Sequence, residues 1–321
     1  MIDLVSVIVP VYNHAQYLEQ CLDSIYNDDY PNIELIILDD GSKDESLEVI
    51  QNWRVDHPDR FHKFYLEKQE NMGVCKTLNK LVSLSQGKYI CPLASDDYLL
   101  AGGIQTRVNA LENNPDWLLV FGDQIIVDED NNLINDSGIS LFRGNKAILS
   151  NRKFIEREII LCWPIAGATC LIKKDAFHPE IGVGLFPENS CVEDVDFYYR
   201  LLARRAVGFI DSKVLGYRIV SNSASHHPIT KINLLKDWQN AASKNSANFQ
   251  GLNGLCLKLL SYRLKLIFNK ITVPSLKNKF IYLPFAIVFK LICSSHRFYF
   301  YVHSLFESLK MDHKLFIDSR K

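Results

Sequence analysis

Two adjacent carboxylates, Asp96 and Asp97, follow an apolar run that begins at Tyr89. Such a run is typical of a buried strand, and open α/β sheets bind their ligands at the carboxyl ends of their strands. Because an unpaired buried carboxylate is costly, two acids at this position need a partner. A divalent cation would supply one, since Mg²⁺ and Mn²⁺ prefer hard oxygen ligands. The alternative is a solvated turn whose acids cap the next helix.

Polar groups also follow the two predicted strands nearest the N-terminus. The first strand ends at Pro10 and is followed by Tyr12, and the second continues directly into Asp39 and Asp40. The carboxyl ends of parallel strands meet at one edge of a sheet, so we expect these groups to surround one crevice. One acid would suffice to hold the turn after the second strand, and the other is predicted to accept a hydrogen bond from a nucleobase or a ribose. Tyr12 could stack on the base or belong to the packing.

The sequence contains no glycine-rich phosphate loop. Neither GxGxxG nor GxxxxGK[ST] occurs in the chain, so a phosphate cradled on glycine amides is not expected. The charge of a phosphate group would then have to be met by a metal ion, which again points to Asp96.

The hydrophobic pattern predicts the elements that position these groups. Asn13 is expected to cap the first helix, and Ser42 with Glu45 to form a capping box for the second. Three β–α units in series predict a parallel, right-handed α/β sheet. The predicted strands cover residues 5–10, 33–38, 61–66, 89–94, 117–121 and 124–127, and the predicted helices cover 14–26, a segment from 42, 74–84 and 101–114.

A further acidic pair, Glu193 and Asp194, opens a predicted helix. Acids in a first helical turn favour the helix dipole, which is a purely structural role. A general base needs both reach and a suitable pKa, and the residues alone leave both roles open. The small residues Gly167 and Ala168 lie in a run that is either a core strand or a place where a ligand approaches the backbone.

The ordered motifs of residues 5–100 resemble the family 2 glycosyltransferases of the GT-A fold. They are Val-Ser-Val-Ile-Val-Pro-Val-Tyr-Asn, Leu-Asp-Asp-Gly-Ser-Lys-Asp, Asn-Met-Gly-Val followed by Leu-Asn, Gly-Lys-Tyr-Ile, and Ser-Asp-Asp. The resemblance implies that the first strand and the Asp-Asp-Gly-Ser loop hold the nucleotide of a sugar donor. It implies Mn²⁺ or Mg²⁺ bound by Asp96 on the donor diphosphate. The implied donor-binding residues are Pro10, Tyr12, Asn13, Asp39, Asp40, Asn71, Gly73, Asp96 and Asp97.

The resemblance extends to the acceptor side of the reaction. It implies that Asp194 is the base that deprotonates the acceptor hydroxyl, with Glu193, Gly167 and Ala168 beside the acceptor. Tyr217 and Arg218 resemble the start of a Tyr-Arg-x-His segment that closes over the donor as a lid.

The chain departs from the family pattern at three positions. Ala94 stands where the family commonly has an acid, Leu78 where it often has arginine, and Val220 where it has the histidine of the lid segment. His226 and His227 follow Val220 closely and could contact phosphate or metal in its place, although exposed loop histidines are more common.

The resemblance implies an inverting glycosyltransferase of the bacterial polysaccharide or O-antigen type, which moves a sugar from a UDP-sugar or similar donor to a glycan or lipid-linked acceptor. The alternative is a catalytically weak partner that binds nucleotide-sugar in a glycan-assembly complex. We expect a GT-A domain over residues 1–225, followed by a basic helical region over 226–321.

The charge of the chain is concentrated at its C-terminal end. Residues 251–321 hold 12 Lys and Arg against 3 Asp and Glu, interleaved with apolar residues. This pattern predicts contact with an anionic membrane surface or packing against the core or a second copy of the chain. Nucleic acid is not an expected partner, because no nucleic-acid-binding motif accompanies the charge.

The eight cysteines form no CxxC pair, and the N-terminus carries no signal-like segment. Reduced thiols and the lack of a run of about 18 apolar residues predict a cytoplasmic protein, peripheral at most on the inner face of the plasma membrane.

Overall fold

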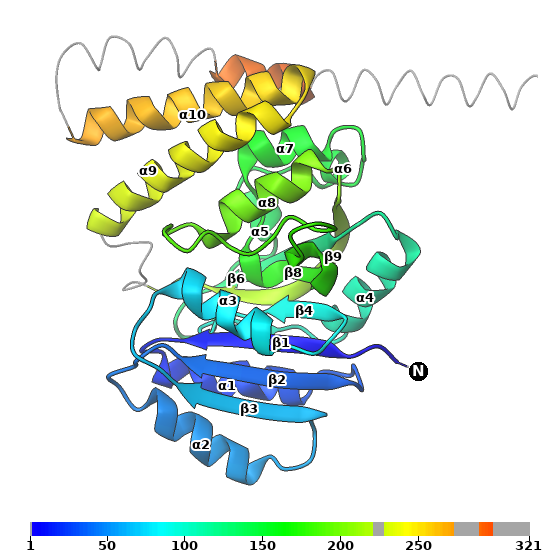
Figure 1. Ribbon diagram of the computed structural model, residues 1–321, viewed down its shortest axis with the longest axis vertical. Coiled ribbons are helices and arrows are strands. Elements are labelled where there is room, and N and C mark those ends of the chain that lie inside the picture. Colours follow the sequence, from blue (N-terminus) through cyan, green and yellow to red (C-terminus); the bar gives the residue numbers. More distant parts are fainter. Residues whose placement is uncertain (1, 221–227, 273–288, 298–321) are drawn as a thin grey trace, which may run out of the picture.

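A nine-stranded mixed sheet forms the centre of the computed structural model, which describes residues 2–220, 228–272 and 289–297 (Figure 1). The strands are β1 Val5–Val11, β2 Ile33–Asp39, β3 Lys63–Lys68, β4 Tyr89–Pro92, β5 Tyr98–Leu99, β6 Leu119–Val127, β7 Leu133–Asn135, β8 Cys170–Lys173 and β9 Val207–Arg218. The helices are α1 Ala15–Tyr26, α2 Ser46–Asp56, α3 Val74–Leu84, α4 Gly103–Asn113, α5 Gly138–Leu141, α6 Lys146–Leu149, α7 Ile155–Cys162, α8 Glu193–Ala203, α9 Pro228–Asn245 and α10 Gly251–Thr272. Short 3₁₀ helices cover Gly167–Thr169, Lys174–Phe177 and Ser246–Asn248.

The strand order is β3-β2-β1-β4-β8-β6-β9-β5, and β7 pairs with β6. The first four strands of the chain pair in parallel, as the β–α units predicted. The parallel arrangement does not extend across the sheet, because β8 runs antiparallel to both β4 and β6. The fold class is α/β as predicted, with a parallel N-terminal half and a mixed C-terminal half.

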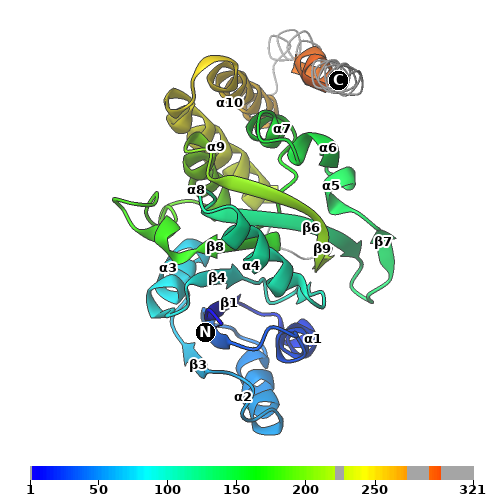
Figure 2. The same ribbon diagram turned by 90° about the vertical axis from the view of Figure 1, so that its right-hand side faces the viewer.

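Hydrophobic side chains fill both faces of the sheet. Along β1, Val7 and Val9 belong to one core with the inner faces of α1, α2 and α4. Ile8 points to the other core, which contains residues of α3, α7 and α8. Figure 2 shows α1 and α3 on opposite sides of β1, as this alternation requires.

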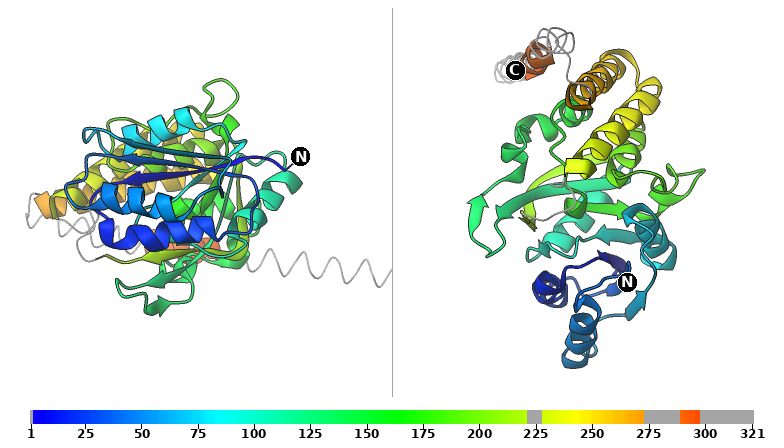
Figure 3. Two further views of the ribbon diagram at one scale, coloured as in Figure 1. Left: turned by 90° about the horizontal axis from the view of Figure 1, so that it is seen from below. Right: turned by 90° about the vertical axis from the view of Figure 1, so that its left-hand side faces the viewer.

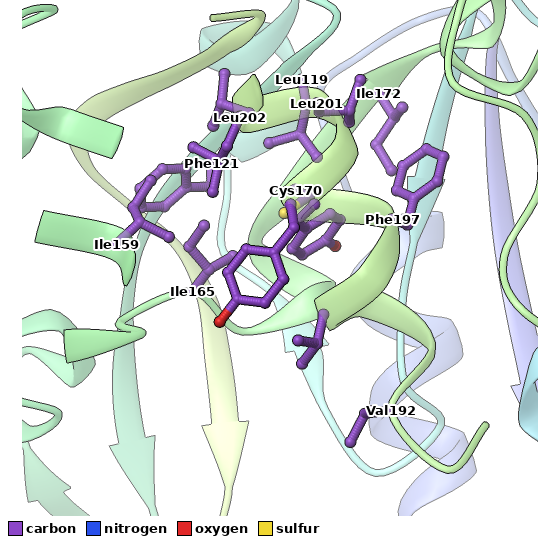
Figure 4. Packing of buried hydrophobic residues seen from close by; sticks show 14 of the residues in the cluster. Leu119, Phe121, Ile159, Ile165, Cys170, Ile172, Val192, Phe197, Leu201 and Leu202 are labelled. Atoms are coloured by element: carbon purple, nitrogen blue, oxygen red, sulfur yellow. The ribbon is translucent and has the colours of Figure 1, made fainter. Parts of the chain in front are cut away.

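The C-terminal helices are continuous with the second core. Leu257 and Leu260 of α10 and Ala242 of α9 are buried in the same cluster as Phe197 and Leu201 of α8. Figure 3 shows α9 and α10 lying over the end of the molecule opposite α2, and Figure 4 shows the packing beneath α8. Within the described residues, no helix is both long and apolar enough to cross a membrane.

Three local predictions are wrong. Asn13 does not cap α1; its side chain instead accepts the N–H of Lys43 at 2.7 Å. Ser42 and Glu45 form no capping box, since the Ser42 hydroxyl accepts the N–H of Asn13 at 3.0 Å and α2 begins at Ser46. The two strands expected around Gly122 are the single strand β6, whose pairing with β9 shifts register there.

Candidate active site

Two cavities adjoin at the carboxyl ends of β1 and β4. The first has a volume of about 670 Å³ and the second about 840 Å³. They share a boundary, because the same six residues line both: Val74, Ala94, Asp97, Phe142, Cys191 and Tyr217. A ligand extending from one cavity into the other would pass between these side chains.

The first cavity collects most of the predicted donor-binding residues. They come from the end of β1, the loop after β2, the start of α3 and the turn after β4, as expected for the carboxyl edge of a parallel sheet. Tyr12 is 45% exposed and leaves its ring open to a partner. The predicted residues that line this cavity are Pro10, Tyr12, Asp40, Asn71, Gly73, Asp96, Asp97, Tyr217 and Arg218.

Both acids of the Asp-Asp-Gly-Ser turn are engaged within the fold. Asp39 is fully buried, accepts the N–H of Ser42 at 2.7 Å, and lies 3.7 Å from the Lys68 ammonium group. Asp40 accepts the N–H groups of Met72 and Gly73 at 2.8 and 2.9 Å. Of the two acids, Asp39 holds the turn after β2, whereas Asp40 fixes the loop that carries Asn71. A nucleotide contact by either acid stays a prediction.

Asn13 does not line either cavity. Its backbone and side chain join the loop after β1 to the loop after β2 through Ser42 and Lys43. It adopts φ = 54°, a left-handed conformation that asparagine tolerates better than most residues. Asn13 therefore shapes the first cavity indirectly, through the two loops that it connects.

The Ser95-Asp96-Asp97 turn presents one accessible carboxylate to the first cavity. Asp96 is 18% exposed, and the Nδ1 atom of His14 lies 4.0 Å from its Oδ1 atom. The same imidazole nitrogen lies 2.8 Å from the Ser95 hydroxyl. Asp97 is buried, and its carboxylate accepts the backbone N–H of Arg218 at 2.9 Å. Burial, and then the neighbouring Asp96 charge, raise the pKa of Asp97 well above its usual range.

The donor set around Asp96 fits a magnesium-type ion bound together with a substrate. Within the described ranges, no group of three or more His, Cys, Asp or Glu residues could hold a metal by protein ligands alone. Mg²⁺ is commonly held by one or two carboxylates, with the phosphate oxygens of a substrate and water completing the shell. Asp96 offers such a carboxylate, and His14 is the adjacent nitrogen donor.

Tyr217 and Arg218 form a fixed wall of the site at the end of β9. The Arg218 guanidinium donates to the carbonyl oxygens of Asp96 and Glu129 and to the Gln20 side chain, at 2.6 to 3.1 Å. Burial, and then the Asp97 and Asp96 carboxylates, raise the pKa of Tyr217 to about 12. The lid role stays a prediction, and His226 and His227 lie outside the described residues.

The second cavity contains the predicted acceptor-side residues. Glu193 and Asp194 reach it from the first turn of α8, and Gly167 and Ala168 from the 3₁₀ turn before β8. The loop before α8 is tied to α3 by a pair of hydrogen bonds. Asn79 of α3 exchanges two hydrogen bonds with the backbone of Phe186, each 3.0 Å long.

Glu193 and Asp194 form an acidic pair with perturbed proton affinity. Burial, and then the charge of Asp194, raise the pKa of Glu193 to about 8. Burial raises the pKa of Asp194 to about 6, although the backbone N–H groups of Val195 and Asp194 oppose the shift. Both carboxyl groups therefore bind a proton more tightly than an ordinary carboxyl, and Asp194 is the more acidic of the two, which suits a general base.

Sequence reasoning missed several cavity-lining residues. Trp163, Leu234 and Trp238 line the second cavity, and Phe142 lines both. Leu234 and Trp238 belong to α9, in the basic helical region expected over residues 226–321. His14 lines the first cavity and was also missed. Its position immediately after Tyr12 and Asn13, which were predicted, is the one signal in the sequence that could have found it.

The chain matches a known protein family and is similar to several curated proteins. Residues 6–177 match the family model described as Glycosyl transferase family 2. An uncharacterised glycosyltransferase of Rickettsia felis is 28% identical over 225 residues, which are 69% of this chain and 35% of that protein. Chondroitin synthase of Escherichia coli is 30% identical over 135 residues, 42% of this chain and 19% of that protein. The chain thus spans about a third of the first of these relatives and less of the second.

Solved structures share the fold. TarS 1–349 of S. aureus in complex with UDP-GlcNAc aligns with a TM-score of 0.63 at 16% identity, covering 89% of this chain and 80% of that one. The mannosyltransferase PcManGT of Pyrobaculum calidifontis, in complex with GDP-Man and Mn²⁺, aligns with a TM-score of 0.55 at 17% identity, covering 91% and 84%. At these identities the likeness confirms the predicted GT-A fold.

Proposed function

This chain belongs to glycosyl transferase family 2, and we propose that it transfers a sugar, with inversion, from a nucleoside-diphosphate donor to a hydroxyl group. The observation that carries the proposal is the pair of adjoining cavities. One contains the accessible Asp96 carboxylate, and the other contains the partly buried pair Glu193 and Asp194, whose pKa values are raised. The shared boundary is where the donor sugar and the acceptor hydroxyl would meet.

The first cavity would hold the donor, and we favour a UDP-sugar. Tyr12 would stack on the base, while Asp39 and Asp40 hold the loops that surround it. The exposed Asp96 carboxylate, together with His14, would hold Mn²⁺ or Mg²⁺ beside the diphosphate. When bound, such an ion neutralises charge on the departing diphosphate. UDP-GlcNAc in the TarS complex supports the choice of donor class.

The second cavity would hold the acceptor. Asp194 would take the proton of the acceptor hydroxyl as that oxygen attacks the anomeric carbon from the face opposite the leaving diphosphate. The bond from the anomeric carbon to the diphosphate breaks as the bond to the acceptor oxygen forms, so the configuration inverts. Glu193 would remain protonated beside Asp194 at neutral pH, because its pKa is about 8.

The acceptor would be a glycan or a lipid-linked sugar in polysaccharide synthesis. Chondroitin synthase among the relatives supports the polysaccharide role. The outer face of α10 supports a lipid surface nearby, because Leu252 and Leu255 are each 51% exposed beside exposed Lys258 and Lys265. Apolar and basic residues on one helical face are typical of contact with an anionic membrane. A second copy of the chain on this face is the alternative.

A catalytically weak binding partner remains the second candidate function. Ala94 and Val220, two departures from the family pattern, both line the first cavity and place no ionisable group there. A partner of this kind would bind the donor and release no product.

The test of the proposed function is a thermal-shift screen of UDP, UDP-sugars and GDP-sugars with Mn²⁺, followed by assay of nucleotide release. We expect stabilisation by a nucleotide-sugar and turnover that is lost with EDTA and with Asp194→Asn. Binding without turnover across a broad acceptor panel would favour the partner role. Absence of binding by every nucleotide-sugar would contradict both.

A further inference from the structure

The second cavity is lined by aromatic rings next to the acidic pair. Four aromatic side chains reach it: Phe142, Trp163, Tyr217 and Trp238. Phe142 and Tyr217 also border the first cavity, whereas Trp163 and Trp238 belong to the second alone. A mostly apolar pocket with a few convergent polar groups is the usual form of a small-molecule site.

Trp163 is held in a backbone conformation that is unfavourable for its type. It has φ = 45° and ψ = 66°, in the left-handed region, and it precedes Pro164. Glycine is the usual residue where a helix ends in this conformation, and a residue before proline normally adopts extended backbone. A tryptophan here indicates a role for the side chain that the end of α7 does not itself require.

Surrounding contacts fix the indole in place. The backbone N–H of Trp163 donates to the Ile159 carbonyl at 2.8 Å. Its ring centroid lies 5.2 Å from that of Tyr199 and 5.6 Å from that of Trp238, both edge-on. The Trp238 indole N–H is already donated to the Tyr199 hydroxyl at 3.0 Å. Trp163 is thus an aromatic surface held by the neighbouring rings of Tyr198, Tyr199 and Trp238 and only partly buried.

The charges of the cavity disfavour an anionic ligand. Its lining contains three carboxyl groups, those of Asp97, Glu193 and Asp194, and one cation, Arg143. A phosphate or uronic acid beside the pair would meet a negative charge in a desolvated setting. A neutral hexose has hydroxyl groups for the acids and an apolar C–H face for an aromatic ring.

We propose that this cavity binds a neutral sugar as the terminal residue of the acceptor, with its apolar face stacked on the Trp163 indole. The inference rests on the proposed function and adds the acceptor class and the positioning residue. Charged groups of the acceptor, if it carries any, would lie outside this cavity.

The test measures binding of simple glycosides by saturation-transfer NMR in the presence of UDP and Mn²⁺. The neutral probes are the methyl β-glycosides of glucose, galactose and N-acetylglucosamine, and the anionic probes are methyl β-glucuronide and glycerol 3-phosphate. Trp163→Gly removes the ring and suits the left-handed backbone, so it is expected to fold. Trp163→Phe retains an aromatic surface, and Trp117→Phe is the control, because Trp117 lines neither cavity.

We expect at least one neutral probe to bind, with about tenfold weaker affinity in Trp163→Gly and near-normal affinity in Trp163→Phe and Trp117→Phe. Unchanged binding in Trp163→Gly, equal or tighter binding of the anionic probes, or no binding of any neutral probe would each overturn the inference. UDP binding and donor hydrolysis are measured on the same samples. If the wild-type protein showed neither, that result would instead contradict the proposed function.

Discussion

The acidic pair at the start of α8 gives a quantitative prediction for the pH dependence of catalysis. If Asp194 is the base, its ionised form is required, and kcat/KM reports its pKa in the free enzyme. With a pKa of about 6, the ionised fraction rises about tenfold between about pH 5 and pH 7. An Asp at its ordinary pKa would be almost fully ionised across this interval, so the rate would stay nearly constant.

Two substitutions assign the inflection to one member of the pair. Asp194→Asn is expected to lower kcat by about 10²- to 10⁴-fold, the usual contribution of a general base. Glu193→Gln is expected to keep the inflection near pH 6, because Glu193, with a pKa of about 8, is still protonated there. The assay is nucleotide release from the donor identified by thermal shift, with UDP binding as the control for folding.

The same pair makes a prediction about stability. Carboxyl groups whose pKa is raised on folding bind protons more tightly in the folded state, so stability falls as pH rises through the interval from the unfolded to the folded pKa. For Asp194 this interval runs from 3.8 to about 6, and the cost above it is at most about 3 kcal/mol. Asp194→Asn should therefore be inactive yet more stable than the wild-type protein at pH 8, as measured by urea unfolding.

Either of two results would refute this reasoning. A rate that is flat between about pH 5 and pH 7 would show that no group with a raised pKa near 6 controls catalysis. An inflection near pH 8 that disappears in an inactive Glu193→Gln variant would make Glu193 the base and Asp194 its neighbour.

Three further predictions test other parts of the site. Asp96→Asn should reduce the additional rise in melting temperature that Mn²⁺ causes in the presence of UDP. If this additional rise were unchanged, Asp96 would not be the metal ligand. Gly41→Ala should destabilise the fold by about 1–3 kcal/mol in urea and weaken UDP binding. Gly41 has φ = 82°, and an added Cβ would lie 2.9 Å from the Asn71 backbone nitrogen. An unchanged midpoint of urea unfolding would contradict this. Leu252→Asp with Leu255→Asp should reduce sedimentation with anionic vesicles while UDP binding persists, whereas a change from dimer to monomer without loss of sedimentation would favour a second copy of the chain on α10.

The lining of the first cavity could be predicted from the sequence because its geometry follows from strand direction alone. Runs ending at Pro10, Asp39 and the Ser95-Asp96 turn belong to parallel strands, whose carboxyl ends must share one edge. The residue types at those ends then determine which groups meet. No knowledge of side-chain orientation is needed for that step.

The lining of the second cavity could not be predicted in the same way. The direction of β8 depends on long-range pairing with β4 and β6, and a short apolar run does not encode it. Trp163 reaches the second cavity from a left-handed backbone conformation that tryptophan rarely adopts, so residue preferences do not predict it. Trp238 reaches the cavity only because α9 packs on α8, far from the motifs in sequence.

The three departures from the family pattern differ in what they change. Leu78 is buried in the core beneath the sheet and lines neither cavity. Leucine in place of the family's arginine therefore changes the packing of the core and not the lining of the site. Ala94 and Val220 both line the first cavity, and Ala94 also borders the second. An acid and an imidazole of the family pattern are therefore missing from the first cavity, where Asp96 and His14 lie 4.0 Å apart. If this cavity binds the donor as proposed, binding would depend more on these two groups than the family pattern implies, while the acidic pair in the second cavity is unaltered.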